Sequence, residues 1–278
     1  MRFARIEHND NPTYGIVSGD AGAEEIALIT GDLFDGWDRS HNPAADPARL
    51  TGERLALADA NLLVPVVPTT FYAAGLNYTD HVLEHARVNG REPNIPAKPD
   101  IGYRANNALI AHGQSIVKPS DSTEVFQYEG EIVAVIGKRI KHVSEAEALD
   151  CVFGYTIGND VSERTWQNQD RTFWRSKNTD TFKPMGPWIE TGIVTGADLD
   201  ALETTVRLNG REVIRFPTNN MLFGIALYIS TMSRYLTLQP GDVIWMGTEG
   251  HAENMVPGDV CEIEIDGIGM LRNAVVAE

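Results

Sequence analysis

The amino-acid sequence predicts an α+β protein that is mostly β with a few helices. Short runs rich in β-branched residues recur along the chain, and they do not alternate regularly with helical patterns. The dipeptide Asn209-Gly210 separates two such runs and is a strong hairpin signal, because both turn positions tolerate positive φ. The sequence contains no Gly-x-Gly-x-x-Gly turn and no Walker-type loop, which disfavours a doubly wound nucleotide-binding sheet.

The first 65 residues predict a small N-terminal β domain. Three runs in it have the composition of strands, at 2–6, 14–17 and 25–29, and an acidic stretch broken by Pro and Gly follows at 31–59. Pro65 and Pro68 favour extended chain and interrupt regular strand pairing. We therefore place a domain boundary here, with residues 1–65 before it and a larger domain, residues 66–278, after it.

The larger domain is predicted to be mostly β. Its strand signals lie at 116–118, 131–136, 152–158, 188–190, 204–208, 211–214, 243–246, 260–265 and 268–272. Two helices interrupt them. Ser144 and Glu147 have capping-box spacing ahead of a short helix, and Asn219 or Asn220 is expected to cap an apolar helix from Met221 to about Leu236.

Composition excludes several classes of function. With 39 acidic and 23 basic side chains the net charge is −16, which would repel a nucleic-acid backbone. No apolar stretch has the length of a membrane span or signal peptide, so we expect a soluble, cytoplasmic protein without membrane or nucleic-acid partners. Cys151 and Cys261 lie in apolar runs, which predicts buried free thiols in a reducing compartment.

The clearest chemical signal is a set of three carboxylates. Glu129 and Glu131 stand two residues apart at the head of an apolar run, so in a strand both project from one face. Gly130 between them permits a close backbone approach or a bulge. Asp160 closes a second apolar run that can pair beside the first. Three oxygen ligands without cysteine suit a hard cation such as Mg²⁺ or Mn²⁺, whereas a lone Glu-x-Glu is more often a solvated strand end.

A second signal lies in the segment 75–85. If it is helical, His81 meets Glu84 at i,i+3 and His85 at i,i+4, and a histidine oriented by a carboxylate is a competent general base. A surface histidine in an ordinary helix ion pair is the simpler reading. His81, Glu84 and His85 also match the inverted zinc-protease motif. That motif needs a longer helix than Asn89-Gly90 and the following prolines allow.

Two further segments carry groups that suit an anionic ligand. The polar stretch 167–183 holds four cations in an acidic protein, and it is either a ligand-facing wall or a solvated loop: Arg171, Arg175, Lys177 and Lys183. Residues 247–250 follow an apolar strand, and there the Thr248 hydroxyl and backbone N–H groups can bind a carboxylate. A plain turn is the alternative at this position.

Taken in order, these segments resemble the fumarylacetoacetate hydrolase family over residues 70 to 276. The matching pieces are Gly75 to Tyr78 with Asp80-His81, Tyr128 to Glu131 with Val135 to Lys138, Gly154-Tyr155 with Gly158 to Ser162, Ser176-Lys177 with Asp180 to Phe182, Pro184 to Trp188, Leu238 with Pro240 to Ile244, Gly247-Thr248, Pro257 to Val260, and Gly267 to Gly269 with Leu271 to Asn273. The resemblance implies a mixed β-sandwich roll as the catalytic domain, a small N-terminal β domain and a homodimer.

The resemblance also implies roles for individual residues. It assigns a metal, Mg²⁺, Mn²⁺ or Ca²⁺, to Glu129, Glu131 and Asp160. It makes His81 with Glu84 the pair that activates water, and it places Lys177 beside the metal and substrate. Gln167 and Thr248 are implied substrate contacts. Two departures occur: Glu249-Gly250-His251 replaces the common Pro-Ala-Gly, and Tyr103 and Arg104, which we expect to contact the substrate, replace a Phe-x-Lys segment.

These assignments predict hydrolytic carbon–carbon cleavage of a small 2-oxo acid. The substrate would be a 2,4-dioxo acid, acylpyruvate-like or a diketo-deoxy sugar acid, cleaved through a metal-stabilised enolate. Decarboxylation of oxaloacetate and isomerisation or hydration of an unsaturated 2-oxo acid use the same kind of site and stay open. A non-catalytic binding protein is disfavoured because the carboxylates and the base are all present. The polar segment 81–100 is expected to act as a lid.

Overall fold

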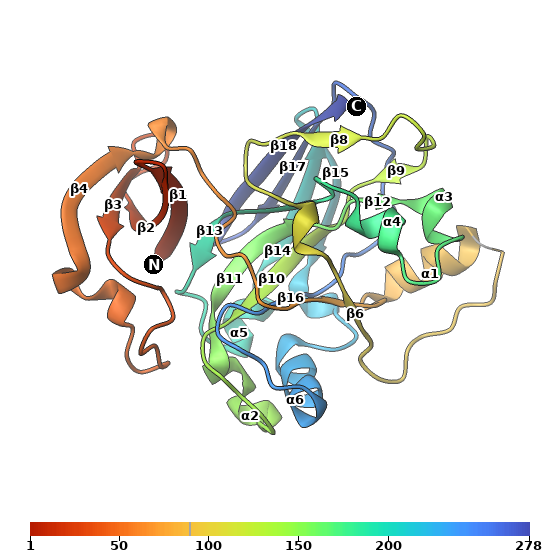
Figure 1. Ribbon diagram of the computed structural model, residues 1–278. Helices are drawn as coiled ribbons and strands as arrows, with labels where there is room; N and C mark the ends of the chain where they lie inside the picture. The colour runs from red at the N-terminus through yellow and green to blue at the C-terminus, as the bar shows by residue number, and fades with distance from the viewer. Residues whose placement is uncertain (89) are drawn as a thin grey trace.

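The chain folds around two β-sheets in the computed structural model, which describes residues 1–88 and 90–278 but not the side chain of His85 (Figure 1). In the described residues the larger sheet has the order β4 (Leu50–Ala56), β3 (Glu25–Ile29), β2 (Asn11–Ser18), β1 (Arg2–His8), β13 (Lys183–Glu190), β11 (Val152–Asn159), β10 (Gly130–Ile136), β16 (Val243–Trp245), β5 (Phe71–Ala74) and β6 (Ile101–Tyr103), with β7 (Leu109–Ile110) beside β13. The smaller sheet has the order β15 (Arg211–Pro217), β14 (Glu203–Leu208), β17 (Val260–Ile265), β18 (Gly269–Ala277) and β8 (Ile116–Lys118). β9 (Phe126–Gln127) and β12 (Ser162–Glu163) form a short separate pair.

The helices are short and lie around the sheets. They are α1 (Thr79–Val88), α2 (Glu145–Ala148), α3 (Arg164–Gln167), α4 (Trp174–Asn178), α5 (Gly196–Asp200) and α6 (Ile225–Tyr235). Single 3₁₀ turns occupy Pro43–Ala45, Pro47–Arg49, Leu57–Asp59, Asn106–Ala108, Leu149–Cys151 and Thr218–Asn220. Figure 1 shows α2 and α6 together at one end of the molecule and α1, α3 and α4 on another side. In the described part of the chain, none of these helices is both long and apolar enough to cross a bilayer.

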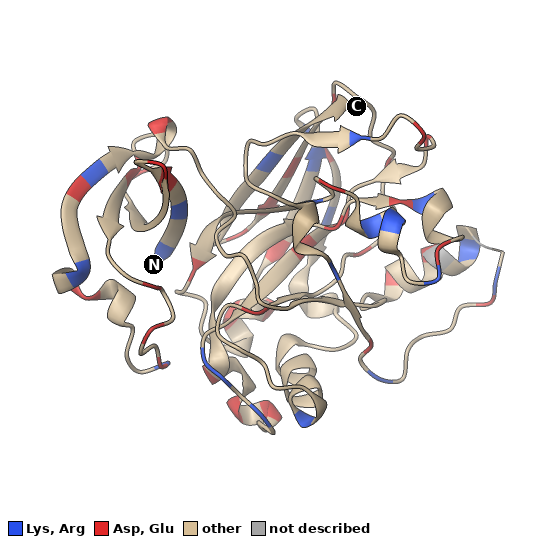
Figure 2. Cartoon of the chain, in the orientation of Figure 1, with Lys and Arg blue, Asp and Glu red and all other residues tan. Residues whose placement is uncertain are grey.

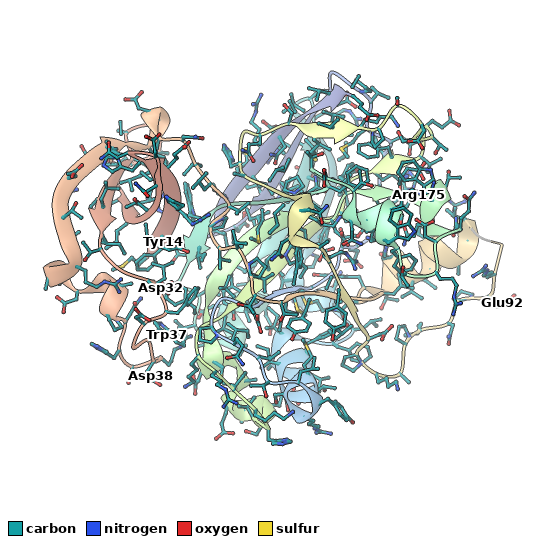
Figure 3. All side chains as sticks on the ribbon, in the orientation of Figure 1. Tyr14, Asp32, Trp37, Asp38, Glu92 and Arg175 are labelled. Carbon is teal, nitrogen blue, oxygen red and sulfur yellow. The ribbon has the colours of Figure 1, made fainter. Side chains whose placement is uncertain are left out.

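The N-terminal strands extend the larger sheet, because β1 pairs with β13. The three predicted runs form β1, β2 and β3, whereas β4 was not predicted, since its side chains are almost all exposed and show no apolar alternation. Trp37 packs edge-on against Phe153 of β11, with ring centroids 5.7 Å apart, where this segment meets the rest of the molecule (Figure 3).

A glycine allows the two sheets to approach each other. A Cβ on Gly130 of β10 would lie 3.0 Å from Val206 Cγ2 and 3.1 Å from Ile263 Cγ2 of the smaller sheet. The predicted close approach at Gly130 is therefore confirmed, and a larger residue would push the sheets apart. Cys151 and Cys261 lie in this core, buried and free, as predicted.

Two local predictions from turn and cap chemistry are confirmed. Asn209 and Gly210 have φ of 54° and 77° and join β14 to β15, with Leu208 opposite Arg211. Ser144 caps α2 through a capping box, and its hydroxyl lies 2.6 Å from the Glu147 carboxylate.

The predicted start of the apolar helix is wrong by about one turn. α6 begins at Ile225 instead of Met221, and Asn219 and Asn220 lie in a 3₁₀ turn instead of capping the helix. The reason is tertiary, because Asn77 binds the intervening segment: its side-chain oxygen accepts from the Phe223 N–H at 3.0 Å, and its carbonyl accepts from the Leu222 N–H at 2.7 Å. These bonds hold residues 221–223 out of helical conformation.

Candidate active site

Backbone pairing brings the three predicted carboxylates together. β10 and β11 are antiparallel neighbours with Gly130 opposite Asn159, and the Asp160 N–H donates to the Glu129 carbonyl at 2.9 Å. The predicted pairing of these two apolar runs is confirmed. Glu129, Glu131 and Asp160 each offer a carboxylate oxygen, and the three oxygens lie within 4.8 Å of one another. The start of one strand and the end of its neighbour therefore form one acidic cluster.

The electrostatics of Glu131 fit a bound cation. Its side chain is buried, and the Gly247 N–H donates to it at 2.7 Å. Burial, followed by the charges of Asp160 and Glu129, raises the pKa of Glu131 to about 8. A buried carboxylate held against two like charges calls for a positive partner, and three oxygen donors suit Mg²⁺, Mn²⁺ or Ca²⁺. These three residues would hold the ion and leave positions open for water and substrate.

Lys177 lies against two of the carboxylates. Its Nζ lies 2.7 Å from Glu129 Oε2 and 2.7 Å from Asp160 Oδ2, and its side chain is buried. Burial alone would raise the pKa of Glu129, but the charges of Lys177 and Arg164 lower it to about 2. Glu129 is thus held ionised by its neighbours, and Lys177 lies beside two of the three carboxylates.

Arg104 binds Asp160, a contact that the sequence did not predict, and it also lines the cavity where it was expected to contact the substrate. Its Nη2 lies 2.8 Å from Asp160 Oδ2, and its Nη1 donates to the Tyr103 carbonyl. Lys183, fully buried, approaches the other oxygen of Asp160 at 2.7 Å. Burial would raise the pKa of Asp160, but Arg104, Lys177 and Lys183 hold it well below its usual range. The guanidinium therefore neutralises one of the three clustered carboxylates.

The four cations of the polar stretch 167–183 divide into two groups. Figure 2 shows basic residues on α3 and α4 despite the negative net charge. Lys177 and Lys183 reach the carboxylates. Arg175 lies over the Trp166 ring, 4.5 Å from its centroid, and pairs with Asp170 at 3.2 Å (Figure 3). Arg171 is exposed. Two of the four cations therefore pair with the carboxylate cluster, whereas the other two lie away from it.

His81 lies beside the carboxylates and is oriented by a backbone carbonyl. Its Nε2 is 4.0 Å from Glu129 Oε1, and its Nδ1 is 3.1 Å from the Gly250 carbonyl oxygen. A carbonyl only accepts, so Nδ1 carries the proton and Nε2 presents its lone pair. Burial is the main cause that lowers the pKa of His81, which favours the neutral ring. This arrangement suits a general base that faces the cluster.

The prediction that Glu84 orients His81 is wrong for this structure. Both residues lie on α1, but the Glu84 carboxylate bonds to Arg87 at 2.7 Å and to His251 Nδ1 at 3.1 Å. Arg87 reaches Glu84 from the next helical turn with a bidentate bond, which competes with any bond to His81. The predicted meeting of His81 with His85 concerns a side chain outside the described residues.

One cavity of about 840 Å³ contains most of the predicted site residues. The predicted residues that line it are His81, Arg104, Glu129, Glu131, Asp160, Gln167, Lys177 and Thr248. Residues 94–98, which follow α1, cover part of it, and Phe173 forms another part of its wall. The segments at 75–77 and 247–248 complete the lining because they follow the parallel neighbours β5 and β16.

Tyr103 does not line this cavity in the structure, contrary to its prediction as a substrate contact. Its ring is 57% exposed and packs beside Tyr72, with centroids 5.4 Å apart. Successive side chains of an extended chain point to opposite faces, so Tyr103 faces away when Arg104 faces the carboxylates. Alternation along the β6 segment therefore allows only one of the two residues into the site.

Sequence reasoning missed Arg164 as a site residue. Its Nη1 lies 2.5 Å from Glu129 Oε1 and 3.0 Å from Gln167 Oε1, and its Nε donates to Gln127 at 2.8 Å. Its position three residues before Gln167 on a short helix was the available signal, because i,i+3 residues share one face. Gly250 gave no such signal, since its contribution is a backbone carbonyl.

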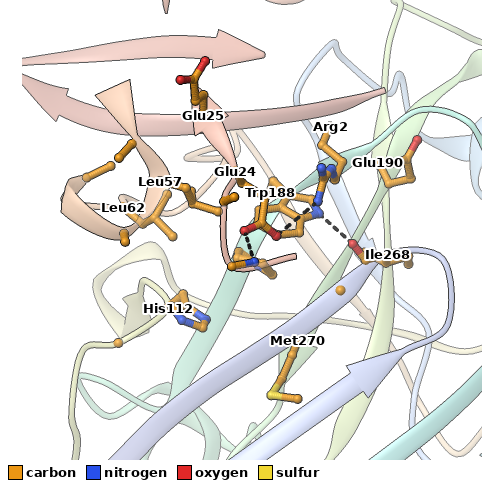
Figure 4. A pocket seen from close by; sticks show the side chains of 18 of the residues that line it. Arg2, Glu24, Glu25, Leu57, Leu62, His112, Trp188, Glu190, Ile268 and Met270 are labelled. Atoms are coloured by element: carbon orange, nitrogen blue, oxygen red, sulfur yellow. Dashed lines mark hydrogen bonds and ion pairs between the residues drawn. The ribbon is translucent and has the colours of Figure 1, made fainter. Parts of the chain in front are cut away.

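A second, wider groove of about 1180 Å³ lies between the N-terminal strands and the β13 and β18 region (Figure 4). Arg2 lies over the Trp188 ring at 5.0 Å and 3.9 Å from Glu24, and Trp188 donates to the Ile268 carbonyl at 2.6 Å. Among the described residues, the side chains grouped closely enough to hold a metal are Glu129, Glu131 and Asp160, at the ends of β10 and β11. None of these three residues lines the wider groove. We therefore assign the chemistry to the cavity of about 840 Å³ that these carboxylates line.

Two known protein families together match nearly the whole chain. Residues 70–276 match the family described as "Fumarylacetoacetate (FAA) hydrolase C-terminal", and residues 1–65 match the family described as "Rv2993c-like, N-terminal". Protein Rv2993c of Mycobacterium tuberculosis is 36% identical over 276 residues, which cover 99% of this chain and 98% of that protein.

Two solved structures share the fold over the full length of this chain. The crystal structure of 5-carboxymethyl-2-hydroxymuconate delta-isomerase from Mycobacterium smegmatis has a TM-score of 0.85 and 34% identity, and all of both chains is covered. Maleylpyruvate hydrolase from Sphingobium sp. SYK-6, in complex with manganese(II) ion and pyruvate, has a TM-score of 0.77 and 30% identity, with 100% of this chain and 99% of that one covered. The similar proteins thus include both an isomerase and a hydrolase.

Proposed function

Since this chain belongs to the fumarylacetoacetate hydrolase family, we propose that it is a divalent-metal-dependent hydrolase that cleaves a carbon–carbon bond in a 2,4-dioxo acid. The substrate class is acylpyruvates or diketo-deoxy sugar acids. The observation that carries the proposal is the position of His81: its Nδ1 is held by the Gly250 carbonyl, and its Nε2 lies 4.0 Å from Glu129. A water molecule near the cluster is within reach of a base in this position.

Glu129, Glu131 and Asp160 are the residues that would hold the metal. When bound, the cation would supply Lewis-acid polarisation of the 2-oxo acid end of the substrate, and it would neutralise negative charge there. The raised pKa of Glu131 and the mutual distances of the three carboxylates support this choice. The maleylpyruvate hydrolase with manganese and pyruvate supports it by similarity.

The chain's own residues supply the remaining steps. His81 takes a proton from water at Nε2, and the oxygen attacks the carbonyl farther from the carboxylate. The bond between that carbon and the neighbouring methylene then breaks, which releases a carboxylic acid and a pyruvate unit that leaves as its enolate and gains a proton. Lys177, buried beside Glu129 and Asp160, places positive charge where the pyruvate unit gains negative charge. Gln167 and Thr248, both on the cavity wall, would contact the carbonyl and the carboxylate.

Acetylpyruvate cleavage tests this proposal directly. Purified protein should release acetate and pyruvate, lose this activity with EDTA and regain it with Mg²⁺ or Mn²⁺. Cleavage that resists EDTA would exclude the metal-dependent route. Absence of turnover with any of these metals would exclude acylpyruvates that resemble acetylpyruvate.

An isomerase or decarboxylase is the second candidate function. The similarity over the whole chain to a delta-isomerase favours it, because the same base and the same cation site can move a proton along an unsaturated 2-oxo acid. Parallel assays with oxaloacetate and acetylpyruvate separate the two functions, since the hydrolase alone produces acetate. Decarboxylation of oxaloacetate without acetate release would favour the second candidate.

We also propose the homodimer that the family resemblance implies. Light scattering on the eluate of a size-exclusion column tests it, because a chain of 30.6 kDa should then elute at twice that mass. A monomeric mass would contradict it. The only other partner we propose is the small 2-oxo acid.

A further inference from the structure

We propose that this site selects substrates with a short, uncharged aliphatic acyl group; the inference rests on the proposed function. A small side cavity of about 100 Å³ adjoins the main one. His81 and Gln167 line both cavities. We place the attacked carbonyl of a substrate bound at the carboxylate cluster beside these two shared residues, which directs its acyl group into the side cavity.

Most of the surface that the described walls expose to the side cavity is apolar, although most of the residues that line it have polar side chains. Val125, Ala252 and Val88 contribute aliphatic surface, and the backbone at Gly250 closes one side. The remaining lining residues are polar: His81, Glu84, Gln127, Arg164, Gln167, Asn168 and His251. Several of these side chains use their hydrogen-bonding groups on protein partners, so their carbon atoms are left for contact with a ligand.

The partners of the polar lining can be followed one by one. The Gln127 amide donates to the Ala252 carbonyl at 3.1 Å and to Asn254 Oδ1 at 2.9 Å, and its oxygen accepts from Arg164 Nε at 2.8 Å. Glu84 bonds to His251 at 3.1 Å. Gln127 and Glu84 are therefore satisfied before a ligand arrives, and an acyl group that replaced these bonds would leave polar groups unpaired.

The charges beside the side cavity disfavour a second carboxylate on the substrate. Arg164 is its one described cation other than the histidines, and this guanidinium already pairs with Glu129 at 2.5 Å. Glu84, which also lines the side cavity, would repel a distal carboxylate. A carboxylate placed here would lose its hydration without gaining an unshared cation.

The volume sets an upper limit on the acyl group. An apolar cavity of ~150 Å³ accepts benzene, and this one is smaller. One water-sized group needs ~10–15 Å³ of such volume, so the cavity holds several of them. Acetyl, propionyl and butyryl groups therefore fit, whereas a benzoyl group does not.

Binding of three 2-oxo acids tests this inference without requiring turnover. Isothermal titration calorimetry of the full chain, with Mg²⁺ present, would compare the dissociation constants of 2-oxohexanoate, 2-oxoadipate and 2-oxo-4-phenylbutanoate. We expect 2-oxohexanoate to bind at least ~10-fold more tightly than either of the others, since a pocket discriminates by ~10- to 200-fold for a misfitted group. Equal or tighter binding of 2-oxoadipate or the phenyl compound would overturn the inference.

Substitution of the cavity wall provides the second arm. Ala252→Leu should fill the cavity and weaken 2-oxohexanoate binding by ~10-fold, with much less effect on pyruvate, which does not reach it. Ala197→Leu, the same change at an exposed position on α5, is the matched control. Equal weakening of both ligands by Ala252→Leu would mean that the side cavity does not hold the tail.

Kinetics separate failure of this inference from failure of the proposed function. Acetyl-, butyryl-, benzoyl- and fumarylpyruvate would be compared by kcat/KM. If none is cleaved, the hydrolase function fails, but the titrations still decide the selectivity of the site. If benzoyl- or fumarylpyruvate is cleaved as efficiently as butyrylpyruvate, the function stands and the inference fails.

Discussion

The two sides of the site are built in different ways. On the carboxylate side, Glu129, Glu131 and Asp160 are buried at the ends of two paired strands, and a backbone bond of 2.9 Å joins Asp160 to Glu129. On the histidine side, His81 on α1 is held by the carbonyl of Gly250 in the loop 247–251. Sheet register thus fixes the first side, whereas contact between two distant segments fixes the second.

The two sides also differ in charge and exposure. Arg104, Lys177 and Lys183 surround Asp160 in the interior. The neighbours of His81 are partly exposed: the Glu84 side chain is 21% accessible and that of His251 is 65% accessible. The carboxylate side is therefore preorganised for a cation, and the histidine side is the part that sequence changes can adjust more easily.

The largest effect is expected on the carboxylate side, for Glu131→Gln. Loss of one ligand and its charge should abolish tight Mn²⁺ binding and reduce kcat/KM by roughly 10³-fold, since a bound cation supplies several kcal/mol of charge stabilisation. Without metal, the melting temperature of the variant should be no lower than that of the wild type, because burial and like charges already disfavour the ionised Glu131. Mn²⁺ titration by electron paramagnetic resonance, kinetics and thermal melts measure these outcomes.

The matched control is Glu25→Gln on β3, where the Glu25 side chain is 56% exposed. It should leave metal binding and activity unchanged. If Glu131→Gln kept wild-type Mn²⁺ affinity, the cluster would not be the metal site, and the contrast between the two sides would lose its basis.

His81→Ala tests the histidine side and should have the next largest effect. Loss of the base should reduce kcat/KM by ~10²- to 10⁴-fold and leave residual activity. Mn²⁺ affinity should not change, because the carboxylates stay in place. His8→Ala, at a partly exposed histidine paired with Glu53, is the control. A large loss of metal affinity in His81→Ala would mean that the two sides are not independent.

Gly250→Ala tests how the base is positioned. Gly250 has φ of +71°, and a Cβ there would lie 2.5 Å from Ile214 Cδ1. The loop must move, and the carbonyl that holds His81 moves with it, so kcat should fall by roughly 10- to 100-fold. In the double variant with Ile214→Val the clashing atom is removed, and part of the activity should return. Full activity in Gly250→Ala alone would show that this carbonyl does not position the base.

Glu84→Gln should have the smallest effect. Because Glu84 bonds to Arg87 and His251 and not to His81, we expect a change in kcat/KM below ~3-fold, typical of a partly exposed ion pair. Glu92→Gln, on the loop after α1, is the control (Figure 3). A loss above ~30-fold would instead support the pairing that the sequence suggested, formed only when ligand is bound.

The carboxylate side was the more predictable one. Glu129 and Glu131 stand at the head of one apolar run and Asp160 at the end of another, so simple strand pairing was enough to bring them together. The hairpin at Asn209-Gly210 and the capping box at Ser144 were equally local, and the structure contains both. Each of these features depends on residues close in sequence or on adjacent strands.

The histidine side could not be predicted in the same way. The i,i+3 spacing of His81 and Glu84 predicted a pair. Arg87 has the same spacing to Glu84, however, and its guanidinium binds the Glu84 carboxylate. The partner of His81 is a backbone carbonyl 169 positions away. Every residue has a backbone carbonyl, so the amino-acid sequence does not indicate which one binds His81. The start of α6 was misplaced for a similar reason, since Asn77 binds the segment before it, at Leu222 and Phe223.

The sequence by itself determined the β-rich fold class, the family and the acidic cluster, because these depend on periodicity, turn chemistry and the order of motifs. Only the tertiary structure decided that Arg104 binds Asp160, that Tyr103 lies outside the cavity and that Gly250 orients His81. In each case several groups from distant parts of the chain could bind the same partner. Distance, burial and charge in the folded protein determine which of them does.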